Sequence, residues 1–310
     1  MLLQKSDTAK FSFHTKHYNT QADRITKIAY VFPESFKLIL RFFDIIIHMA
    51  SDYIFIRKSR NALSTVLHVI MNILLGVGSV LVTIVSGSWI IGFILVLLSK
   101  WRMFAVRPHY LWLNIKSNLV DLIVGFSFVL LAFFSGTTIL PVHYIIAAAY
   151  VLWLTVVKPK TTETWNLIQA LFAVFIGSSA ASILSASINP ILLVVLEFVV
   201  GYGSARHVLA QNNNMNDNGY PSIIFGIIFA EIALLCHSWL IVYAFIDLGI
   251  IISQLALILT VFSFMAERIY RSIEQRDGEL KFKDVAIPLV FSLVCLAVIV
   301  IGFSEPIFNV

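Results

Sequence analysis

The stretch that decides the fold runs from residue 163 to residue 206 and reads ETWNLIQALFAVFIGSSAASILSASINPILLVVLEFVVGYGSAR. It has no charged residue between Glu163 and Glu197. Asn189 and Pro190 interrupt it, because asparagine can cap a helix and proline favours the first helical position. About 20 apolar residues in a helix cross the roughly 30 Å of a bilayer's hydrocarbon core. The stretch therefore predicts two membrane-spanning helices, 163–184 and 190–206.

The rest of the chain has the same character. Of its 310 residues, 59% are hydrophobic and 13% are charged, whereas ordinary soluble domains are about 45–50% apolar. The charged residues are confined to short segments between long apolar runs, which excludes a soluble globular domain, a disordered chain and a fibrous protein. The predicted fold class is all-α, a polytopic helical membrane protein.

Long apolar runs predict about nine transmembrane helices, since a membrane helix must satisfy its backbone internally. These are 62–85, 88–106, 118–136, 140–157, 163–184, 190–206, 221–245, 249–266 and 285–303. The second is the weakest, because it contains Lys100 and Arg102. It is either a span whose two basic side chains snorkel to the interface or a re-entrant hairpin. Asp247 and Gly249 place a reversal between the seventh and eighth.

The basic residues predict the orientation, because Lys and Arg are retained on the cytoplasmic side. With the N-terminus inside, the cytoplasmic segments are 1–60, 100–117, 158–162, 206–220 and 267–284. They hold 10, 4, 2, 1 and 5 Lys or Arg, which is all 22 in the chain. The opposite loops hold none, and the C-terminus lies outside. We expect a multi-pass protein of a bacterial plasma (inner) membrane.

Residues 1–60 are interpreted as a basic cytoplasmic region, and residues 61–310 as the transmembrane domain. Within the first, segment 34–57 carries one polar stripe at helical spacing: Lys37, Arg41, Asp44, His48 and Asp52. This pattern favours an amphipathic helix lying in the membrane interface, with Lys37 and Arg41 toward anionic headgroups. The alternative, a tenth span, would bury five polar side chains and move the basic tail outside.

Two acidic residues lie deep in predicted spans, where a charge is costly and functional groups concentrate. Glu197 is seven residues beyond Pro190, and Glu231 is ten residues beyond Pro221, so both fall near the same middle depth. A carboxylate pair there is a candidate proton or cation site. His237 is a further proton-binding candidate or an interfacial residue. The alternative for each glutamate is a hydrogen bond that locks helix packing.

A basic and aromatic segment between the second and third spans is typical of an inner-leaflet anchor, since Trp and Tyr prefer the headgroup region. Its candidate headgroup residues are Lys100, Trp101, Arg102, Arg107, Tyr110 and Trp112. Anionic lipids are therefore the expected partners, and nucleic acid is not expected. Asp121 and Gln169, about one turn inside their helix ends, face a vestibule or make capping and packing contacts.

The chain has no phosphate-binding glycine loop, zinc-protease helix motif or Cys-x-x-Cys pair, so we expect no metal and no cofactor. A serine of Gly177-Ser178-Ser179-Ala180 in a dyad with His237 would suit an intramembrane protease. However, residues 177–187 contain nine Gly, Ala or Ser, which favours close helix packing over catalysis.

Three functions remain open from the sequence. The first is a small carrier or channel-like protein with Glu197 and Glu231 as its ion site. The second is a non-enzymatic scaffold or assembly factor that binds anionic lipid and partner proteins, including a second copy of itself. The third is an intramembrane or lipid-modifying enzyme, which ranks last because no catalytic motif is present.

Overall fold

The structure is a computed structural model that describes residues 62–105, 107–136, 141–187, 189–210, 219–237, 242–245, 250–274 and 282–302. Contacts divide the chain after Leu67, and the packing described below is that of the unit from His68 onward. The predicted interfacial helix 34–57, with Lys37 and Arg41, lies outside the described residues.

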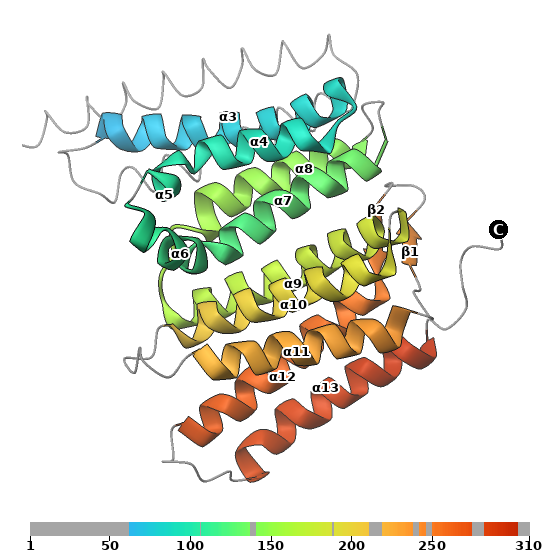
Figure 1. The fold of residues 1–310 in the computed structure, drawn as a ribbon. Coiled ribbons are helices and arrows are strands. Elements are labelled where there is room, and N and C mark those ends of the chain that lie inside the picture. The colour runs from blue at the N-terminus through green and yellow to red at the C-terminus, as the bar shows by residue number, and fades with distance from the viewer. Residues whose placement is uncertain are drawn as a thin grey trace, which may run out of the picture. The chain divides into compact units, whose positions relative to one another are not determined.

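The described part is built almost entirely from helices (Figure 1). In chain order the elements are α3 (Ala62–Ser86), α4 (Trp89–Ser99), α5 (Trp101–Phe104), α6 (Pro108–Ser117), α7 (Leu119–Phe134), α8 (Pro141–Leu152), the wide π-helical turn η1 (Trp153–Val157), α9 (Glu163–Ser187), α10 (Pro190–Leu209), α11 (Gly219–Cys236), β1 (Val242–Phe245), β2 (Ile250–Ser253), α12 (Gln254–Glu274) and α13 (Phe282–Gly302).

Each of the nine predicted spans contains helix. Among the described residues, four helices are long and apolar enough to cross a membrane: Val66–Ser86, Glu163–Ala186, Pro190–Leu209 and Gly219–Cys236. A fifth is present if α6 and α7, which are bent by 64°, form one span. Trp89–Ser99, Pro141–Val157 and Val285–Ile301 are shorter apolar helices. The helical membrane class is therefore supported, and the number nine stays a prediction.

The prediction of one helix over 221–245 is wrong at its C-terminal end. Helix α11 ends at Cys236, and β1 pairs with β2 in an antiparallel hairpin. Both strands are rich in β-branched and aromatic residues, which fit an extended backbone better than a helix. The reversal itself falls where the turn residues predict it, because Phe245 is paired with Ile250 across the turn.

Helix α9 is the centre of the packing. It contacts α7, α10 and α12, while α10 lies between α9 and α11 and α12 lies beside α13 (Figure 1). Stacked aromatic rings join α7, α8 and α9, with Phe128 5.0 Å from Tyr150 and Trp153 5.2 Å from Phe172 between ring centroids. These rings and the small residues of α9 fix how closely the neighbouring helices approach.

Polarity in this part of the chain is arranged as in a membrane protein. Large apolar side chains such as Val85 and Ile287 are 81% and 80% exposed, whereas four serines of α9 are buried: Ser178, Ser179, Ser182 and Ser185. Ser178, Ala181 and Ser182 are each at most 3% exposed. The predicted packing role of residues 177–187 is confirmed, because small side chains let helices approach closely in lipid.

Candidate functional site: a basic pocket

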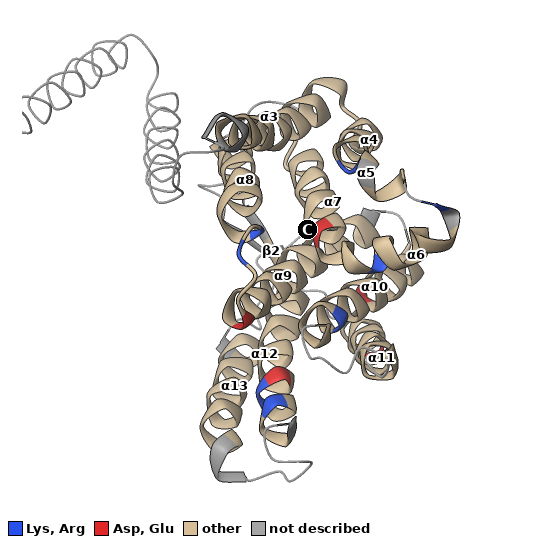
Figure 2. Cartoon of the chain, turned by 90° about the vertical axis from the view of Figure 1, so that its left-hand side faces the viewer, with Lys and Arg blue, Asp and Glu red and all other residues tan. Residues whose placement is uncertain are grey.

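Four of the segments predicted to be cytoplasmic meet at one end of the helices. Lys100 and Lys158 both contact Asp121. The amide of Gln169 donates to the Lys160 carbonyl at 2.8 Å, and its oxygen contacts His207 at 2.9 Å. Figure 2, which looks onto this end, shows its basic and acidic residues. The ion pair between Arg271 and Glu163 belongs to the same end.

Arg271 of α12 lies 2.5 Å from Glu163 of α9. It also donates to Glu267, one turn earlier in α12. The start of α9 and the end of α12 are therefore neighbours, although 108 residues separate Glu163 from Arg271 in the chain.

Asp121 is the centre of the polar cluster at this end, and it is 9% exposed. Its Oδ2 accepts from Lys100 Nζ and lies 2.6 Å from Lys158 Nζ, while Trp153 Nε1 donates to its Oδ1 at 3.3 Å. One carboxylate thus binds two ammonium groups and an indole. Because two positive charges face one negative charge, the cluster keeps a net charge of +1.

Local breaks in the helices place these side chains. In η1 the Lys158 amide donates to the Trp153 carbonyl at 2.9 Å, so the turn is one residue wider than an α-helical turn. Both flanking side chains then reach Asp121. The bend between α6 and α7 occurs at Asn118. Asn118 and Asn114, one turn earlier, both line the cavity at this bend.

These residues line a cavity of about 350 Å³. Its lining consists of Ser99, Lys100, Met103, Asn114, Asn118, Asp121 and Lys158, which we call the basic pocket. The Lys100 side chain, which follows the last residue of α4, is 9% exposed, and that of Lys158 is 44% exposed. Burial lowers the pKa of Lys100 below its usual range, and the neighbouring Asp121 carboxylate opposes this effect. The amides and ammonium groups suit a phosphate-type anion.

One of the predicted anchor residues belongs to the lining of the basic pocket. Lys100 lies inside it, while Trp101, Tyr110 and Trp112 are 63%, 51% and 63% exposed. Arg107 precedes α6 and is exposed. Within α6, Lys116 Nζ lies 4.9 Å from the centroid of the Trp112 ring.

Arg102, the last of the predicted anchor residues, belongs to α5. Exposed aromatic rings next to basic groups suit the headgroup layer of a membrane. The arrangement therefore supports an interfacial position for α5 and α6.

Glu197 occupies a different environment, at the contact between α9 and α10. It is 0% exposed, and its Oε2 accepts from Ser178 Oγ at 2.7 Å. Its Oε1 has no hydrogen-bond partner in the described part of the chain. Ser178 donates its hydroxyl proton to Glu197, and Ser179 donates to the Phe175 carbonyl at 2.8 Å. Neither hydroxyl therefore donates to His237, as a catalytic dyad would require.

Glu231 and Glu197 are not brought together by a hydrogen bond, because both oxygens of Glu197 are accounted for above. Glu231 is exposed on α11, on the same face as the exposed Ile227 and Leu234. His237 follows α11 and has a buried Nδ1 without a hydrogen-bond partner among the described residues. The three candidates predicted from the sequence therefore lie in separate environments.

Sequence reasoning missed Lys158 as a site residue and left Asp121 and Gln169 undecided. Lys158 and Lys100 belong to segments predicted on the same side of the membrane, and Asp121 lies just inside a helix end on that side. Their shared side of the membrane was the feature of the sequence that could have indicated a cluster of these three residues. Among the described residues, no group of three or more His, Cys, Asp or Glu could hold a metal ion.

No protein-family model, curated protein or solved structure matches the chain.

Proposed function

We propose that this membrane protein binds a phosphate-bearing anion in the basic pocket, as a non-enzymatic scaffold or assembly factor would. The observation that carries the proposal is the pair of lysines on one carboxylate. Asp121 neutralises one ammonium group, and the remaining charge is available to a ligand. Charge-assisted hydrogen bonds from ammonium groups to phosphate are among the stronger polar contacts in proteins.

The surroundings favour the headgroup of an anionic lipid as the source of the phosphate. The exposed Trp101 and Trp112 belong to α5 and α6, which also contribute residues to the pocket lining. The inner leaflet carries anionic lipids that attract basic segments. A soluble phosphate compound offers the same chemistry. The proposed topology, with nine spans, the N-terminus inside and a bacterial inner membrane, places this end of the helices at the cytoplasmic leaflet.

The test compares two lysines that are two residues apart. Lys158→Gln removes a pocket cation, whereas Lys160→Gln removes one that lies 3.6 Å from the Trp165 ring centroid instead. Binding of phosphatidic acid is measured by its retention on the purified protein against a phosphatidylcholine background. We expect Lys158→Gln to weaken retention about tenfold and Lys160→Gln to leave it unchanged.

Equal retention by wild type and Lys158→Gln would overturn the proposal. The source of the phosphate is decided by competition with inorganic phosphate. If inorganic phosphate displaces the lipid at millimolar concentration, the ligand is a soluble phosphate compound. If it does not, the lipid headgroup is recognised together with its interfacial position.

A second candidate function is a proton or cation carrier that uses Glu197, with Glu231 as the second acid of the predicted pair. The buried Oε1 without a hydrogen-bond partner favours it, because such an atom can accept a proton or a cation. In proteoliposomes that contain a pH-sensitive dye, Glu197→Gln or Glu231→Gln should abolish ion-coupled flux while the protein remains folded. Wild-type flux in both variants would exclude the carrier.

A further inference from the structure

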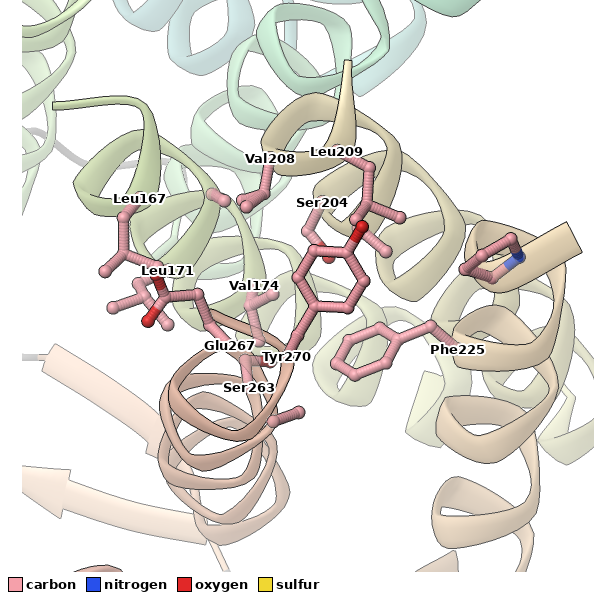
Figure 3. Close-up of a pocket in the computed structure, with 14 residues that line it drawn as sticks. Leu167, Leu171, Val174, Ser204, Val208, Leu209, Phe225, Ser263, Glu267 and Tyr270 are labelled. Atoms are coloured by element: carbon pink, nitrogen blue, oxygen red, sulfur yellow. The ribbon is translucent and has the colours of Figure 1, made fainter. Parts of the chain in front are cut away.

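A second cavity lies between α9, α10, α11 and α12 (Figure 3). It has a volume of about 170 Å³ and is lined mainly by apolar side chains, among them Leu171, Val174, Val208 and Phe225. Pockets of this kind bind small molecules through their apolar walls, and a few polar groups fix the orientation. We call it the apolar pocket, and the residues of the basic pocket have no part in it.

Two of the polar groups in the apolar pocket have already used their protons. Ser204 Oγ donates to the Gly201 carbonyl at 3.0 Å, and Ser263 Oγ donates to the Leu259 carbonyl at 2.8 Å. Each hydroxyl has one proton and two lone pairs. Toward the cavity these oxygens therefore act as acceptors.

Glu267 is the charged residue of the lining, and it is 7% exposed. Its Oε1 accepts from Arg271, whereas its Oε2 has no hydrogen-bond partner among the described residues. Arg268 Nε lies 3.7 Å from Oε2, which is too far for a hydrogen bond. A buried carboxylate oxygen without a donor is costly, and a ligand that donates would remove this cost.

Aromatic rings add to the same preference. Phe225 of α11 and Tyr270 of α12 both line the cavity (Figure 3). The face of an aromatic ring attracts a cation through its quadrupole. An anionic ligand, in contrast, would meet the carboxylate and the two serine lone pairs.

We infer that the apolar pocket binds a compact amphipathic amine, whose ammonium group donates to Glu267 Oε2 and whose apolar body lies against α9 and α10. The acceptor-only serines, the Glu267 oxygen that accepts no hydrogen bond from the described residues and the aromatic rings all select a cationic donor. This inference concerns a site separate from the basic pocket and does not depend on phosphate binding.

The experiment uses three probes with the same rigid hydrocarbon body: 1-aminoadamantane, 1-adamantanol and adamantane-1-carboxylate. Their binding to the full chain in phosphatidylcholine nanodiscs is measured by equilibrium dialysis, with empty nanodiscs subtracted. We expect the amine to bind at least about tenfold more tightly than the alcohol or the acid. Equal binding of all three probes would overturn the inference and indicate a cavity filled by lipid chains.

Glu267→Gln should reduce the amine's advantage to less than about threefold, because the amide keeps the shape and removes the charge. Glu274→Gln, at the last residue of the same helix, is the matched control and should keep the full advantage. If Glu267→Gln keeps it as well, the amine binds elsewhere.

Ala266→Leu tests the location without changing any charge, since Ala266 also lines the cavity. The larger side chain should weaken binding of all three probes. This variant remains informative if Glu267→Gln does not fold. Wild-type binding by Ala266→Leu would place the amine outside this cavity and overturn the inference.

Discussion

Two buried carboxyl groups in the same set of helices have opposite surroundings. Asp121, in the first turn of α7, is held by two lysines and an indole N–H. Glu197, between α9 and α10, has a single serine donor and an oxygen without a hydrogen-bond partner in the part of the chain that the structure describes. The difference teaches that Asp121 is a counter-ion that holds two cations together, whereas Glu197 keeps one oxygen free of hydrogen bonds from the described residues.

The largest effect is expected at Asp121. Asp121→Ala would leave Lys100 buried without its counter-ion, and breaking a buried ion pair in this way costs about 3–5 kcal/mol. The free energy of unfolding in mixed micelles measures it, and Asp121→Asn should lose less because it keeps an acceptor for Trp153. An Asp121→Ala protein as stable as wild type would show that the cluster has no structural role.

A smaller effect is expected where the Glu197 region depends on close helix packing. A Cβ atom added at Gly201 would lie 2.6 Å from Phe229 Cγ, so Gly201→Ala should cost about 1–3 kcal/mol. Gly78→Ala is the control, because no atom of the described residues lies within 4 Å of its added Cβ. Thermal unfolding of both variants compares them. Equal melting temperatures would mean that α10 and α11 separate freely at this point.

The pH dependence of anion binding sharpens the description of the Asp121 cluster. Because burial lowers the pKa of Lys100, this residue loses its charge at a lower pH than an exposed lysine does. The pocket's surplus charge is present below that pKa and falls as pH rises through it. Retention of phosphatidic acid should therefore decline on the alkaline side.

Lys100→Arg should remove this decline, since arginine stays charged throughout the range. Lys116→Arg, a substitution in α6 outside the lining of the basic pocket, serves as the control and should leave the profile unchanged. A pH profile that Lys100→Arg does not alter would assign the decline to another group.

The smallest effect on stability is expected for Glu197→Gln. The amide keeps the size of the side chain and an acceptor for the Ser178 hydroxyl, so the change in unfolding free energy should stay below about 1 kcal/mol. Mixed-micelle unfolding measures it alongside the flux assay. A loss as large as that of Asp121→Ala would show that the two carboxyls have the same structural role after all.

The positions of the helices could largely be predicted, because long uncharged runs and boundary residues are local signals. Asn189 does cap α10, with its side chain accepting from the Ile191 amide at 2.8 Å. The hairpin of β1 and β2 could not be predicted, because an apolar run rich in Ile and Val suits a buried strand and a membrane helix equally. The weak segment 88–106 divides into α4 and α5 just where Lys100 interrupts it.

The sites were harder to predict than the helices. Lys100 was identified as a headgroup residue, but its partner Lys158 lies 58 positions later in the chain, and only the packing of α4, α7 and α8 unites them. Whether Glu197 and Glu231 face each other depends on how α10 and α11 are rotated about their own axes. Helix α11 carries apolar residues on all its faces, so its sequence does not tell which face Glu231 shares with its neighbours.

The π-helical turn at η1 makes the basic pocket sensitive to register. Such a turn holds one more residue than an α-helical turn, and each residue advances a helix by roughly 100°. Deleting one residue within 154–157 would leave an ordinary α-helical turn and keep Lys158 near its present direction, whereas inserting one would rotate Lys158 away from Asp121 while Trp153 stays in place. One added codon, with no substitution at the pocket itself, would therefore suffice to separate Lys158 from Asp121.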